Sequence, residues 1–94
     1  MDNDNSTNTD NAEVIALKAL GFLAQDGERF QRFLALTGIA LPAIPEAASD
    51  PAFLGGVLDH FLADQTLLLV FAESEGLAPD RIVRARACLP GAET

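Results

Sequence analysis

The sequence contains no tryptophan or tyrosine, one cysteine, one histidine and only six basic residues among 94. A single cysteine cannot form a disulfide within the chain, so no covalent cross-link is expected and a reducing cytoplasm is the natural compartment. Six basic against 14 acidic side chains give a net charge of −8. This sign disfavours nucleic acid as a partner, because binding to phosphates depends on Lys and Arg displacing counterions.

Long apolar runs and a secretory signal are also missing from the sequence. The longest apolar run, Thr66 to Ala72, is far shorter than the roughly 20 residues that a membrane helix needs. The first residues carry neither a positive segment nor an apolar one, which is not typical of a signal peptide. We therefore expect a cytoplasmic protein with no membrane partner.

The sequence contains few motifs that indicate catalysis or ligand binding. The sequence has no Gly-rich phosphate loop, no Cys/His zinc set and no defensible pair of catalytic carboxylates. Asp59, His60 and Asp64 supply too few ligands for a metal site, although His60 can pair with Asp64 one helical turn later. Cys88 is expected to be a buried structural thiol, and its alternative role is that of a nucleophile beside Arg81 and Arg84. We predict no catalytic residue, no metal and no cofactor.

The residues that are present predict an all-α fold. Hydrophobic residues make up 49% of the chain, and they recur at helical spacing with no useful period-two alternation. Residues 1–11 are polar after Met1 and predict a disordered tail, followed by one helical domain over 12–89 and a short C-terminal tail over 90–94. The caps Asp26, Asp50 and Asp64, the glycines Gly38 and Gly76, and several prolines delimit the helices. Six helices are expected, over residues 12–25, 28–37, 41–48, 51–63, 65–75 and 79–89.

The two halves of the chain resemble each other. At an offset of 39, residues 22–24 fall on 61–63 with the same letters, Phe-Leu-Ala. With one residue deleted from the second half, Gly38 and Ile44 fall on Gly76 and Ile82. Duplication and chance similarity between Ala/Leu/Phe-rich helices both explain these matches. If the halves arose by duplication, the fold is expected to be a six-helix bundle built from two pseudo-repeated three-helix units.

Two helices carry the candidate binding residues. The helix over 51–63 has a second face with Gly55, Gly56, Asp59 and His60, and two glycines inside a helix predict either a close helix crossing or a shallow docking groove. The helix over 65–75 is apolar on nearly its whole circumference, which favours burial at the centre of the bundle. The alternative is an exposed stripe, formed by Leu67 and Leu68, that binds another subunit.

Four stretches of the sequence resemble one family. They read Ala-Leu-Lys-Ala-Leu-Gly-Phe-Leu-Ala at 16–24, Arg-Phe-Leu-Ala-Leu-Thr-Gly at 32–38, Asp-Pro-Ala-Phe-Leu-Gly-Gly-Val-Leu-Asp at 50–59, and Phe-Ala-Glu-Ser-Glu-Gly-Leu at 71–77. Over about residues 12–89 the chain resembles the bacterial domain of unknown function 3572, found mostly in alphaproteobacteria. The resemblance implies a cytoplasmic bacterial protein of unknown activity and carries over no catalytic residue.

Abundant apolar helix surface and scarce reactive side chains favour a non-enzymatic module. We expect it to bind another protein, or a second copy of itself, through the helices over 51–63 and 65–75. Two alternatives remain: a pocket for a small apolar ligand lined by phenylalanines, and an enzyme that uses Cys88 or His60.

Overall fold

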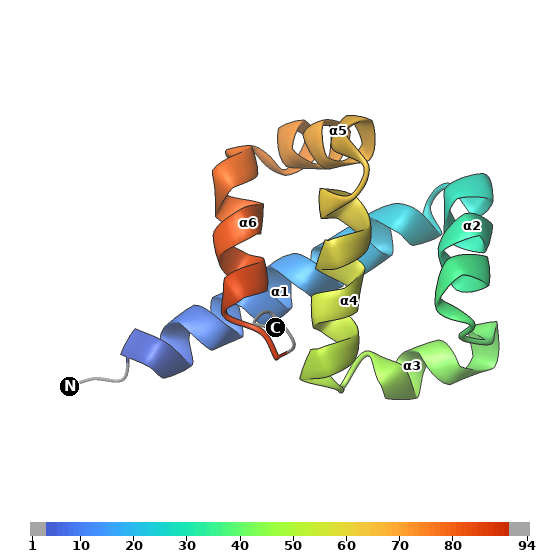
Figure 1. Cartoon of the computed structure of the whole chain (residues 1–94), viewed down its shortest axis with the longest axis horizontal. Helices are drawn as coiled ribbons and strands as arrows, with labels where there is room; N and C mark the ends of the chain where they lie inside the picture. Colours follow the sequence, from blue (N-terminus) through green and yellow to red (C-terminus); the bar gives the residue numbers. More distant parts are fainter. Residues whose placement is uncertain (1–3, 91–94) are drawn as a thin grey trace.

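The computed structural model describes residues 4–90, and in this range it consists of six α-helices and one 3₁₀ turn (Figure 1). No strand occurs in that range. In chain order the elements are α1 (Asp4–Ala24), α2 (Gly27–Thr37), η1 (Leu41–Ala43), α3 (Ile44–Ala47), α4 (Pro51–Leu62), α5 (Gln65–Glu75) and α6 (Pro79–Ala87). They share one hydrophobic core, so the predicted all-α, single-domain helical bundle is confirmed.

Local capping chemistry sets most of the helix boundaries. The Asp26 carboxylate accepts hydrogen bonds from the backbone N–H groups of Glu28 and Arg29, at 3.1 and 3.3 Å. Asp50 and Asp64 cap α4 and α5 in the same way. Gly38 and Gly76 end α2 and α5 with φ of 75° and 68°, a left-handed conformation that glycine adopts without a Cβ clash. These predicted caps are confirmed.

The start of α1 and the end of α6 differ from the prediction. Helix α1 begins at Asp4 rather than Ala12, so it extends into the segment for which a disordered tail was predicted. The polar segment contains no proline or glycine, and extending an existing helix gains one hydrogen bond for each residue fixed. Helix α6 ends at Ala87, before the predicted Leu89. The remaining tail residues, 1–3 and 91–94, lie outside the described residues.

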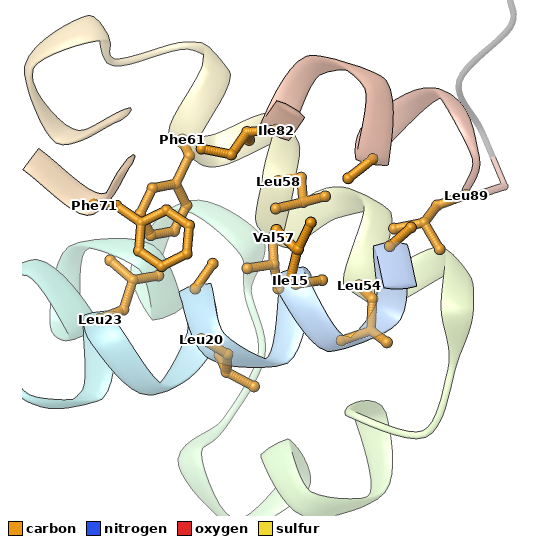
Figure 2. Packing of buried hydrophobic residues seen from close by; sticks show 14 of the residues in the cluster. Ile15, Leu20, Leu23, Leu54, Val57, Leu58, Phe61, Phe71, Ile82 and Leu89 are labelled. Atoms are coloured by element: carbon orange, nitrogen blue, oxygen red, sulfur yellow. The ribbon is translucent and has the colours of Figure 1, made fainter. Parts of the chain in front are cut away.

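Helices α1 and α4 form the centre of the bundle. Helix α1 packs against α2, α4 and α6, and α4 packs also against α5 and α6. Their facing side chains interdigitate in the core with Phe71 and Ile82 (Figure 2). Three rings from α1, α4 and α5 meet there, with centroids 5.0 Å apart for Phe61–Phe71 and 5.5 Å for Phe22–Phe71. The edge-to-face and tilted arrangements are those that aromatic pairs prefer.

Helix α5 does not lie at the centre, and this corrects the expectation of central burial. It packs against α4 and α6 at one edge of the bundle (Figure 1), and it buries only Leu67, Phe71 and Ala72. The opposite side of α5 faces solvent. Helices α4 and α6 therefore cover only part of the apolar surface of α5.

The two halves repeat their local geometry but not their burial. Ala40 and Ala78, which precede η1 and α6, have nearly the same backbone conformation, with φ, ψ of −81°, 145° and −71°, 141°. Of the matched pair Ile44 and Ile82, however, only Ile82 is fully buried. Helix α6 packs against α1 and α4, whereas α3 lies at the edge of the molecule (Figure 1).

No individual helix within residues 4–90 combines the length and the hydropathy needed to cross a membrane. Helices α4 and α5 meet the test only as a pair, and they are bent by 109° at the break between them.

Candidate functional site

The residues of the predicted binding face of α4 lie in two different environments, one against α6 and the other near α2. Gly55 is buried against α6: a Cβ built on it would lie 2.6 Å from Nη1 of Arg86 and 3.0 Å from the Pro90 carbonyl oxygen. Gly56 is half-buried, and a Cβ there would meet no atom within 4 Å. The interpretation as a close helix crossing therefore applies to Gly55, whereas Gly56 lies on a more open side of α4.

Asp59 lies on the Gly55 side and binds Arg86. The guanidinium Nε and Nη2 donate to Oδ1 and Oδ2 of Asp59, at 2.6 and 3.0 Å, which is the bidentate geometry that suits an arginine and a carboxylate. Nη1 donates to the carbonyl oxygens of Leu89 and Pro90, at 3.2 and 2.9 Å. Arg86 thus ties the chain segment after α6 to the middle of α4.

Arg86 is the one buried charged residue among the described residues, and it was not among the residues predicted for a site. A signal for it exists in the sequence. Arg86 follows Ile82 by four residues, so it lies on the apolar face of α6. A basic residue on an apolar face predicts a carboxylate partner, because an unpaired charge there is strongly disfavoured.

His60 lies on the Gly56 side of α4 and packs among aromatic rings. Its ring centroid is 5.2 Å from that of Phe33 on α2 and 6.2 Å from that of Phe61. Burial lowers the pKa of His60 below its ordinary value; the charge of Asp64 raises this pKa and that of Arg32 lowers it, both by less than burial does. The expected pairing with Asp64 therefore does not favour the imidazolium overall.

The two leucines proposed for an exposed stripe on α5 do not form one. Leu67 is 3% exposed and belongs to the core, and Leu68 is half-buried against it. The exposed apolar side chains of α5 are Leu69 and Val70, at 46% and 41%. Thr66 precedes Leu69 by three residues and Glu73 follows it by four, so both lie on the same face of the helix as Leu69. Both are exposed.

Cys88 is exposed, which corrects the expectation of a buried structural thiol. It is the residue that follows α6, and it lines a hollow of about 500 Å³ between α6 and α1. Its neighbours around the hollow include Arg81 and Arg84, as the helical spacing predicted, but not His60. The two chemically suggestive side chains of the sequence are therefore not brought into one site.

All six phenylalanines take part in ring contacts inside the bundle. Phe22, Phe61 and Phe71 pack together, and Phe33 contacts Phe30, Phe53 and the His60 ring. These rings pack on one another, so the interior that was considered for an apolar ligand is occupied by side chains. Within the part of the chain that the structure describes, no group of three or more His, Cys, Asp or Glu residues is placed to hold a metal ion.

The fold and its internal ion pair define a small all-α bundle in which an arginine from the last helix is clamped to the central helix. The chain belongs to the family described as "Protein of unknown function (DUF3572)", whose model matches residues 9–92. The family resemblance seen in the sequence is thereby confirmed. Comparison with curated proteins and with solved structures finds no match.

Proposed function

We propose that this chain is a cytoplasmic, non-enzymatic module that binds another protein through the solvent face of α5. The observation that carries the proposal is the exposure of Leu69 and Val70 on a helix at the edge of the bundle. Single exposed apolar side chains need no explanation, whereas Leu69 and Val70 adjoin the half-buried Leu68 and form a continuous apolar stretch on α5. The partner would cover a face that the fold itself leaves open.

Charge favours a partner other than a second copy of the chain. Each copy carries a net charge of −8, so two copies repel each other at low salt. Glu73 lies on the same exposed face as Leu69. A partner that presents an apolar patch with Lys or Arg at its rim would satisfy both features.

The test compares two leucines with equal exposure on different helices. Leu69 on α5 is 46% exposed and Leu17 on α1 is 45% exposed. The tagged chain is cross-linked to its partners in the native cells, and captured proteins are identified by mass spectrometry. We expect Leu69→Ser to abolish capture of a specific protein that the wild type and Leu17→Ser both retain.

Three results would contradict the proposal. Capture that survives Leu69→Ser together with Val70→Ser would exclude the α5 face. Equal loss in Leu69→Ser and Leu17→Ser would indicate non-specific adhesion. Sedimentation of the purified chain as a dimer, dissociated by Leu69→Ser, would make a second copy the occupant and refute the argument from charge.

A further inference from the structure

The hollow between α1 and α6 has an apolar floor and a polar rim. Ala12 and Ile15 of α1 and Ala85 of α6 are buried and form the floor. Arg81 and Arg84 line the rim together with Asn11 and Cys88. The two helices that enclose the hollow pack against each other where α6 crosses α1 (Figure 1), so both sides of it are held by the core.

Two of the six basic residues in this acidic chain, Arg81 and Arg84, line the hollow. Among the side chains of residues 11–90, Arg81 makes no ion pair, and Arg84 pairs with Asp80 at 3.1 Å. Both members of that pair are exposed, and an exposed pair of this kind contributes little, so an incoming anion can compete for the guanidinium.

We infer that this hollow is a binding site for a small organic carboxylate with a short carbon chain. Guanidinium groups are well suited to carboxylates because they donate parallel hydrogen bonds to both oxygens. The floor of Ala12, Ile15 and Ala85 would contact the carbon chain of the ligand.

Cys88 provides a reporter at the rim, because it is the only cysteine in the chain. The rate constants for alkylation of the folded, full-length chain are measured with iodoacetate, a carboxylate, and with iodoacetamide, its neutral analogue. Both reagents react with the same thiolate, so the ratio of the two rate constants cancels the fraction of thiolate. An acidic protein repels iodoacetate on average, whereas the proposed site concentrates it.

We expect this ratio to be higher in the folded chain than in the chain unfolded in urea. Arg81→Gln and Arg84→Gln should each lower the ratio about threefold, the order of effect of one unit charge a few ångströms away in a partly solvated site. Arg32→Gln, which removes the same charge from α2, is the matched control and should leave it nearly unchanged. Circular dichroism confirms that each variant is folded.

A second measurement tests the carbon chain. Butyrate at millimolar concentration should slow alkylation by iodoacetamide in a saturable manner, whereas butyramide should not. A folded-state ratio no higher than the unfolded one, an equal effect of Arg81→Gln and Arg32→Gln, or equal protection by butyrate and butyramide would each overturn the inference. None of these outcomes depends on the α5 face, so this test and that of the protein-binding proposal fail independently.

Discussion

Gly55 and Gly56 are adjacent in sequence and lie in opposite environments, so the same substitution at each should change stability in opposite directions. Alanine in place of glycine inside a helix adds about 1 kcal/mol of helix propensity. At Gly56 nothing lies within 4 Å of the added Cβ. We expect Gly56→Ala to keep this full gain and to stabilise the fold by about 1 kcal/mol.

At Gly55 the added methyl group meets a side chain that is held in place by hydrogen bonds. It would lie 2.6 Å from Nη1 of Arg86 and 3.0 Å from the Pro90 carbonyl oxygen. The guanidinium is held by Asp59 and by two carbonyl groups, so moving it weakens charge-assisted hydrogen bonds, each of which contributes about 1.5–3 kcal/mol. Overpacking itself costs about 1–3 kcal/mol. After subtraction of the propensity gain, we expect Gly55→Ala to destabilise the fold by about 1–3 kcal/mol.

The assay is urea and thermal unfolding followed by far-ultraviolet circular dichroism. The two variants should differ by about 2–4 kcal/mol, which in a domain of this size separates their Tm values by roughly 10 °C or more. A double-mutant cycle with Arg86→Met locates the cause, because contacting residues show a coupling energy. Gly55→Ala should cost less in that background. Equal stabilisation by both alanines, or a cycle with no coupling, would refute the placement of Arg86 against Gly55.

Two further predictions concern His60 and the N-terminal segment. Burial lowers the pKa of His60, so below about pH 6.5 the unfolded chain binds a proton more readily than the folded one and stability falls. The slope of unfolding free energy between pH 7.5 and 5.5 should therefore be smaller in His60→Gln than in the wild type, and equal slopes would contradict the buried position. Residues 2–10 contain no apolar side chain, so deletion of residues 1–10 should lower Tm by less than about 5 °C, which corresponds to about 1 kcal/mol. A larger fall would show that this segment packs on the fold.

Helix boundaries were predictable because they depend on interactions within a few residues. Asp26, Asp50 and Asp64 each cap the helix that they precede, and Gly38 and Gly76 end helices in a conformation that favours glycine. These contacts reach two to four residues along the chain. The sequence alone therefore determined the helices and their order, except at the start of α1 and the end of α6, where the bounds differ from the predicted ones.

Positions within the bundle depended on contacts between residues far apart in the sequence. The bond between Arg86 and Asp59 spans 27 residues, and it decides that Gly55 is covered while Gly56 is open. The apolar circumference of α5 is compatible with a central or an edge position, and only packing against α4 and α6 selected the edge and exposed Leu69. Cys88 is exposed for a similar reason, because α6 turns its buried face, with Ile82 and Arg86, toward α1 and α4. Helical spacing fixes which residues share a face, but the face that becomes buried is set by the neighbouring helices that cover it.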